Sequence, residues 1–144
     1  MKDNYMISVF GTQIVDGEKE TIKLQTAGEY YIENGIKHIK YKEYDNENPG
    51  ICFDNTVTLE GDSIVTVIRA GAANSRLTLE KGRRHQCHYN TMFGDLMVGV
   101  FTQSVESTLG DNGGTLRAAY TLDFNAGLVS KNEIFIKVTE KEGN

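Results

Sequence analysis

Apolar and polar side chains alternate with a period of two along most of this 144-residue chain. In the clearest stretch, the apolar residues occupy every second position: Leu116, Ala118, Tyr120, Leu122 and Phe124. Side chains of an extended strand point alternately to its two faces, so this pattern predicts a strand with one buried face. A helix would need apolar residues three and four positions apart, and no stretch sustains that spacing over three turns. The pattern therefore predicts an all-β protein.

Turn signals separate the alternating stretches. Asp16-Gly17 and Asn34-Gly35 are typical two-residue hairpin turns, because both central positions of a type I′ turn need a positive φ. The other breaks are at residues 45–50, 60–62, 71–74, 81–82, 94–95, 111–114 and 125–127. Nine breaks predict ten strands, and strands joined by tight turns are expected to be antiparallel neighbours in a meander.

One long alternating stretch is expected to place six residues on a common face: Ile22, Leu24, Thr26, Gly28, Tyr30 and Ile32. A meander of ten strands has two free edges, which invite aggregation, and closing the sheet into a barrel removes them. A barrel is therefore favoured over a two-layer sandwich, although periodicity alone does not separate the two. Glycines inside the strands, at Gly11, Gly28 and Gly99, fit the bends that closure requires.

Charge and cysteine content narrow the class of protein. The chain has 15 Lys and Arg against 20 Asp and Glu, a net charge of −5, which opposes non-specific binding to nucleic acid or acidic membranes. Cys52 and Cys87 lie far apart, unlike the cysteines of a small disulfide-stapled secreted domain. Neither a leader-like apolar start nor an apolar run of about 18 residues is visible. We therefore expect a cytoplasmic protein with reduced thiols and no role at a membrane.

Five different short strand and turn motifs follow one another along the chain. They are Gly28-x-Tyr30-Tyr31, Arg69-x-Gly71, Leu77-x-Leu79 ending at Gly82, Tyr89-x-Thr91-x-Phe93-Gly94, and an alternating stretch at 117–125. In this order the motifs resemble the YwiB-like family of uncharacterised Firmicute proteins, a domain of unknown function. The likeness covers most of the chain, but the matching residues are those of barrel strands and turns.

The resemblance implies a calycin-like fold and no particular activity, because the family has none assigned. Pattern and resemblance together predict an antiparallel up-and-down meander, closed into an 8–10-stranded calycin/lipocalin-like barrel over residues 1–144 as a single domain. Calycin-like barrels often bind small apolar molecules, although a fold does not by itself imply a function. The leading hypothesis is therefore a non-catalytic binding protein that holds a small, partly apolar ligand in the barrel.

Arg69 is the candidate polar anchor of that ligand. It follows an apolar run and shares the parity of Val65 and Val67, so we expect it at the end of a buried strand. Such an arginine either pairs with a carboxylate and caps the barrel or binds an anionic group of a ligand. The other candidate ligand-binding residues are aromatic: Tyr30, Tyr89, Tyr120 and Phe124.

A second candidate surface is a cluster of cationic residues beside Tyr89: Arg83, Arg84, His85 and His88. It suggests an alternative function as an interaction module for an acidic protein or RNA, with nucleic acid disfavoured by the negative net charge. A solvated hairpin shoulder is the simpler interpretation, because most charge runs are of that kind.

No catalytic residue, metal site or cofactor is predicted. His85 and Cys87 share a face, and His38 could supply a third metal ligand, but zinc sites usually show closer ligand pairs. None of the three histidines has a nucleophile in a recognisable setting, and no phosphate-binding glycine loop is present. An enzyme is therefore the less favoured class of protein.

Overall fold

The computed structural model describes residues 4–44, 50–71, 74–91, 94–123, 127 and 129–141. These residues form ten strands and no helix. In chain order the strands are β1 (Tyr5–Val15), β2 (Glu18–Glu33), β3 (Ile36–Tyr44), β4 (Cys52–Glu60), β5 (Ile64–Gly71), β6 (Ser75–Glu80), β7 (Arg84–Thr91), β8 (Gly94–Ser107), β9 (Gly114–Asp123) and β10 (Val129–Glu140). The described residues accordingly include no helix long and apolar enough to cross a membrane.

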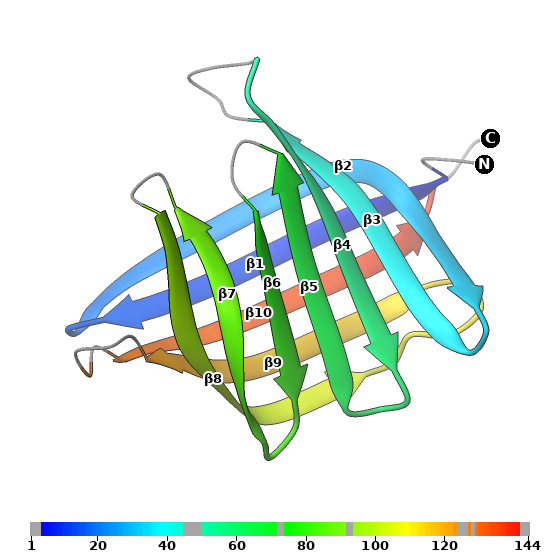
Figure 1. Ribbon diagram of the computed structural model, residues 1–144. Coiled ribbons are helices and arrows are strands. Elements are labelled where there is room, and N and C mark those ends of the chain that lie inside the picture. The colour runs from blue at the N-terminus through cyan, green and yellow to red at the C-terminus, as the bar shows by residue number, and fades with distance from the viewer. Residues whose placement is uncertain are drawn as a thin grey trace.

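Each strand pairs with its neighbours in sequence, and β10 returns to pair with β1, so the sheet closes into a barrel. Each pair of neighbouring strands is antiparallel, which confirms the predicted up-and-down meander of ten strands and excludes a two-layer sandwich. Figure 1 shows the start of β1 and the end of β10 close together at one end of the barrel. The Lys141 N–H donates to the Asn4 carbonyl there, at 3.1 Å.

The two hairpin turns predicted from sequence have the expected backbone. Asp16 and Gly17 have φ values of 53° and 80°, and Asn34 and Gly35 have 54° and 79°. Two consecutive positive φ values match the twist of the flanking strands, as type I′ turns do. Local residue chemistry therefore fixes these two connections.

The centre of the barrel is filled by branched apolar side chains. The largest fully buried side chains are Ile7, Ile39, Leu59, Leu79, Leu116 and Ile136. The predicted alternation on β9 is confirmed, because Leu116, Ala118 and Leu122 are buried and Arg117 is exposed. Small barrels can be filled by their own side chains in this way.

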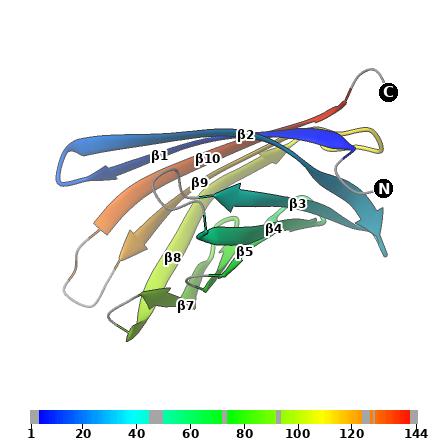
Figure 2. The same cartoon turned by 90° about the horizontal axis from the view of Figure 1, so that it is seen from above.

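β2 changes its pairing partner along its length. Its residues from Glu18 to Gly28 pair with β1, and those from Gly28 to Glu33 pair with β3. Figure 2 shows β2 running beside β1 and then turning toward β3. Gly28 lies at this change of partner, where a Cβ atom would come within 2.7 Å of Ile7 Cγ1 and 3.3 Å of Tyr41 Cβ. A glycine is therefore needed where β2 bends over the core.

The start of β2 corrects one prediction. Ile22 shares the parity of Leu24 and Tyr30, so the alternation predicted a common buried face. Tyr30 is buried, but Ile22 is 62% exposed. In the described part of the chain, β2 has no β3 partner before Gly28, so Ile22 lies on a half of the strand that is paired on one side only. The period of two therefore predicted the strand correctly, but it did not predict how much of that strand is buried.

β6 and β7 form the weakest junction of the wall, which we call the seam. Among the described residues their ladder consists of one pair, Ser75 opposite Tyr89. Toward the other end of the seam, the Thr78 N–H donates to the Cys87 sulfur at 3.5 Å. Beyond β6, the Gly82 N–H donates to the carbonyl of Thr102 on β8 at 2.8 Å. The hydrogen bond to the buried Cys87 thiol and the hydrogen bond from Gly82 to β8 therefore replace part of the missing β6–β7 ladder.

Candidate functional site

The first candidate site lies where β2 and β3 part. Their ladder ends at the pair of Gly28 and Tyr41, after which Lys42 to Tyr44 continue beside β4 alone. A groove of about 600 Å³ occupies this place, and we call it the fork groove. Its lining residues are Thr26, Ala27, Glu29, Lys40, Tyr41, Lys42, Tyr44, Asp54, Asn55 and Thr56.

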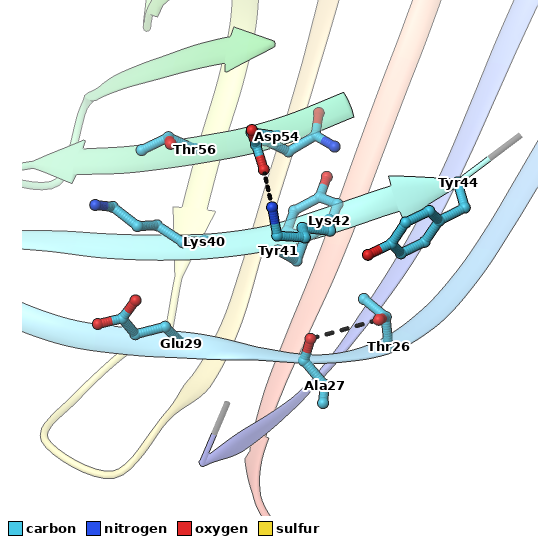
Figure 3. A pocket seen from close by; sticks show the side chains of 10 residues that line it. Thr26, Ala27, Glu29, Lys40, Tyr41, Lys42, Tyr44, Asp54 and Thr56 are labelled. Carbon is cyan, nitrogen blue, oxygen red and sulfur yellow. Dashed lines mark hydrogen bonds and ion pairs between the residues drawn. The ribbon is translucent and has the colours of Figure 1, made fainter. Parts of the chain in front are cut away.

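The fork groove is lined by residues of both faces of the wall. Lys42 and Asp54 are exposed and paired at 2.8 Å on the outer side. Asn55 is only 6% exposed, and Tyr41 packs against the buried core. Figure 3 shows Tyr44 extending from the end of β3 across the gap toward Thr26 of β2. The groove therefore leads from the surface to two polar side chains of the interior face.

Hydrogen-bonding groups are available in the fork groove. The Ala27 carbonyl accepts a bond from the neighbouring Thr26 hydroxyl at 3.4 Å (Figure 3). No described residue bonds the Tyr41 hydroxyl. Burial, reinforced by the charge of Glu43, raises the pKa of Tyr41 to about 12, and the Arg69 charge only partly offsets this. Tyr41 is thus a neutral phenol near pH 7, able to donate and to accept a hydrogen bond.

Behind Tyr41 lies a polar cluster that contains Arg69. Arg69 Nη2 is 3.2 Å from Glu43 Oε1, and the Asn55 amide donates to the same oxygen at 3.4 Å. The Arg69 guanidinium carbon lies 3.9 Å from the centre of the Phe53 ring. Of the two alternatives that the sequence left open for Arg69, this contact corresponds to the first, in which the arginine pairs with a carboxylate and caps the barrel. Its Nε atom is buried and has no described hydrogen-bond partner.

The candidate aromatic ligands do not join Arg69. Tyr30 is buried, and its hydroxyl donates to the Gly110 carbonyl at 2.6 Å, in the β8–β9 connection. In an up-and-down meander that connection and the β5–β6 connection next to Arg69 lie at opposite ends of the barrel. Tyr120 packs against the core. Phe124 lies outside the described residues, as does the side chain of Tyr89, whose main chain pairs with β6 and β8.

Most residues of the cationic cluster, which comprises Arg83, Arg84, His85 and His88, pair with a carboxylate. Arg84 makes two bonds to Asp123, at 2.6 and 2.7 Å, and these bonds hold the pKa of Asp123 below its usual value. A Cβ atom on Gly99 would collide with this pair, so the glycine leaves room for it on the outer face.

The remaining members of the cluster differ in their surroundings. Glu80 serves both Arg83, at 3.7 Å, and His85, at 2.9 Å. His88 is exposed and has no carboxylate partner among the described residues. Three of the four cationic residues are thus matched by acidic side chains, and the surface between Arg83 and Tyr89 is not a continuous positive patch.

The three residues weighed as metal ligands are held apart by other contacts. His38 stacks on Tyr31 with ring centres 4.6 Å apart, His85 contacts Glu80, and Cys87 accepts the Thr78 N–H. No cluster of three or more metal-ligating side chains occurs within the described ranges.

The second candidate site lies on the seam, beside the pair of Ser75 and Tyr89. A groove of about 410 Å³, which we call the seam groove, is lined by Ile68, Arg69, Ala70, Asn74, Ser75, Arg76 and His88. The sequence pattern indicated Arg69 and His88 as candidate site residues but not Arg76. It also gave no indication of Tyr41 and Asn55 in the fork groove. Arg76 is exposed on the outer face of β6, opposite Ile68, and no local signal in the sequence shows that the β6–β7 ladder stops beside it.

The fold and these two grooves define a class of protein: an antiparallel ten-stranded β-barrel with grooves at two places where a ladder of its wall stops. Residues 7–136 match the family model described as a domain of unknown function, DUF1934, and the chain belongs to this family. The sequence-based assignment to an uncharacterised YwiB-like family is thereby confirmed.

A curated relative and a solved structure agree with this assignment. The chain is 27% identical over 107 residues to the uncharacterized beta-barrel protein YwiB of Bacillus subtilis (strain 168), covering 74% of this chain and 72% of that protein. It also matches the crystal structure of the ywiB protein from Bacillus subtilis, with a TM-score of 0.77 and 23% identity, over 94% of this chain and 92% of the other. At this identity the structural likeness supports the fold alone.

Proposed function

We propose that this protein is a non-catalytic binding protein whose fork groove takes up a small, partly apolar molecule. The observation that carries the proposal is a groove of about 600 Å³ that ends on the interior residues Tyr41 and Asn55. Ligand pockets of proteins typically measure roughly 300–1,000 Å³ and combine apolar walls with a few polar groups. Because apolar side chains fill the core, we propose that the ligand binds at the wall of the barrel rather than at its centre.

The charges of the fork groove favour an uncharged ligand. Its rim carries two acidic residues, Glu29 and Asp54, and two basic ones, Lys40 and Lys42. The pair of Lys42 and Asp54 is already formed at 2.8 Å, so neither group is left to attract an ion. The Tyr41 hydroxyl and the side chains of Asn55 and Thr26 offer neutral hydrogen bonds, while the Tyr44 ring offers an apolar face.

The alternative function, an interaction module that uses the surface from Arg83 to Tyr89, has less support. Carboxylates already pair with Arg83, Arg84 and His85. An acidic partner would have to displace them, and exposed pairs of this kind gain little from such an exchange. We therefore rest the proposal on the fork groove, in a cytoplasmic protein without a cofactor.

The test uses Nile red, a neutral dye whose fluorescence rises in an apolar site. The wild-type protein should bind the dye saturably. Ala27→Trp, which fills the groove from β2, should weaken binding at least about tenfold, a change of roughly 1.4 kcal/mol. Tyr44→Ala removes an exposed ring and should weaken binding without perturbing the core. Thermal melting of each variant establishes that it is folded.

Arg76→Ala, in the seam groove, is the matched control and should leave dye binding unchanged. Absence of saturable binding to the wild type would contradict the proposal. Equal affinity for the wild type and both fork-groove variants would contradict it as well, because the dye would then bind elsewhere.

A further inference from the structure

Arg76 differs from the other arginines of the chain. The sequence contains five, and four of them have a carboxylate partner: Arg69 with Glu43, Arg83 with Glu80, Arg84 with Asp123 and Arg117 with Glu133. Arg76 has no ion pair among the described residues. In an acidic protein with 20 carboxylates, an unmatched arginine bordering a groove points to an external anion.

The neighbours of Arg76 strengthen this inference. Arg76 lies opposite Ile68 in the β5–β6 ladder, so the two side chains share the outer face of the wall. The pair of Ser75 and Tyr89 sets a register that places His88 of β7 across from Arg76. Both Arg76 and His88 are exposed. Two potentially cationic side chains from adjacent strands thus flank one groove, and Figure 1 shows β5, β6 and β7 side by side there.

The charged residues that line the seam groove are all basic among those that the structure describes. The groove's seven described lining residues include no Asp or Glu but three basic ones, Arg76, His88 and Arg69, of which Arg69 is already paired with Glu43. Asn74 and Ser75 add neutral hydrogen-bonding groups, and the Asn74 side-chain oxygen already accepts the Gly71 N–H at 3.2 Å. The Asn74 amide nitrogen, which can only donate, is thereby left for a ligand. The Arg76 guanidinium and this amide group supply N–H donors of the kind that an anion requires.

We propose that the seam groove is a binding site for a small organic anion, a phosphate ester or carboxylate with a compact apolar body. Arg76 holds the anionic group with a forked pair of N–H donors, His88 and Ser75 contact the same group, and Ile68 and Ala70 pack against the apolar body. The site is separate from the fork groove in residues and in charge, so it adds a second ligand class to the protein.

The test is an NMR titration of the folded, isotope-labelled chain with phenyl phosphate, compared with its two halves, inorganic phosphate and phenol. Phenyl phosphate should shift the amide signals around Ile68, Arg76 and His88 saturably, inorganic phosphate should shift them more weakly, and phenol should not saturate. A charge-assisted hydrogen bond contributes about 1.5–3 kcal/mol, so Arg76→Ala should weaken phenyl phosphate binding at least about tenfold.

Two controls separate this site from general charge and from the fork groove. Arg83→Ala removes an exposed arginine that Glu80 already pairs, and it should leave the affinity for phenyl phosphate unchanged. Ala27→Trp should also leave it unchanged while it weakens Nile red binding. Arg76→Lys keeps the charge without the fork and should restore part of the affinity.

Three results would overturn the proposal. One is the lack of a saturable shift with phenyl phosphate up to about 10 mM, which corresponds to a binding free energy weaker than roughly −3 kcal/mol. Another is equal affinity of the wild type and Arg76→Ala. The third is a phenol titration that matches phenyl phosphate, because the site would then select an apolar body and not an anion. None of these results bears on Nile red binding in the fork groove.

Discussion

The ladder between β1 and β10 and the seam between β6 and β7 are the two extremes of this barrel. The β1–β10 ladder runs without a break from Tyr5 opposite Glu140 to Val15 opposite Ser130. At the seam, the described residues form only the pair of Ser75 and Tyr89. Both regions bury apolar side chains on their inner faces. A continuous main-chain ladder closes the wall between β1 and β10, whereas side-chain contacts do much of this at the seam.

The difference explains where the candidate sites lie. In a continuous ladder the main-chain groups bond one another, and cross-strand side chains cover the surface. Where a ladder stops, at the seam or at the fork of β2 and β3, polar groups of the wall become available to a ligand. A groove over the continuous β2–β1–β10 ladder near Phe10 has a volume of about 340 Å³, against about 410 and 600 Å³ for the grooves at the two breaks.

The largest effect is expected in the continuous wall. Ile136 on β10 is 1% exposed, so Ile136→Ala leaves a cavity that the tight ladder does not let collapse. We expect a loss of about 2–5 kcal/mol in the free energy of unfolding, measured by urea denaturation. Lys137→Ala, at the adjacent exposed position, is the control and should change stability by less than about 0.5 kcal/mol. Equal losses for the two variants would mean that β10 does not face the core as described.

A smaller effect is expected at the seam. Cys87 is buried, and its sulfur accepts the Thr78 N–H, so Cys87→Ala removes packing atoms and leaves that donor without a partner. A buried unpaired donor costs about 1–3 kcal/mol. Urea denaturation should show a loss in that range, below that of Ile136→Ala. Cys52→Ala is the matched control, because Cys52 is only partly buried. A fully stable Cys87→Ala protein would show that the thiol does not hold the seam.

The smallest effect is expected for the ion pair of Arg84 and Asp123 on the outer face. Arg84 lowers the pKa of Asp123 chiefly through its hydrogen bonds. A lowered carboxyl pKa contributes stability above the pKa of the unfolded chain, near 3.9, and this contribution is lost as the pH falls through the folded-state pKa. Arg84→Ala should therefore raise the pKa of Asp123, as measured by NMR titration, and its stability should approach that of the wild type in acid.

An unchanged Asp123 titration in Arg84→Ala would contradict the paired geometry. Arg83→Ala supplies the comparison, since Arg83 pairs with Glu80 and should not affect Asp123. Both pairs are largely exposed, so neither substitution should approach the effect of Ile136→Ala.

The sequence predicted the features that local chemistry controls. The turns at Asn34-Gly35 and Asp16-Gly17 need residues that accept a positive φ, and the alternation on β9 reports a half-buried strand directly. From these, the ten strands, their order and the closed barrel followed. The sequence also placed Arg69 on the inner face, where it contacts Glu43 and Phe53.

The grooves could not be predicted in the same way, because they depend on where ladders end. β2 reads as one alternating run, yet it changes partner at Gly28, and this long-range choice exposes Ile22 and opens the groove next to Tyr41. Arg76 looks like any outward-facing arginine until its lack of a described carboxylate partner is seen. Tyr30 and Arg69 both take inward-facing positions on their strands, but the period of two does not show that they lie near different ends of the barrel.

Native-state hydrogen exchange, followed residue by residue by NMR, tests the central contrast most directly. The main-chain ladder predicts that amides of Ile7, Val9 and Ile136 exchange only when the whole protein unfolds. Amides of Thr78 and Gln86 at the seam should exchange through smaller openings, with a lower free energy and a weaker dependence on denaturant. Equal protection of the two groups would contradict the account, because the seam would then be as firmly closed as the wall between β1 and β10.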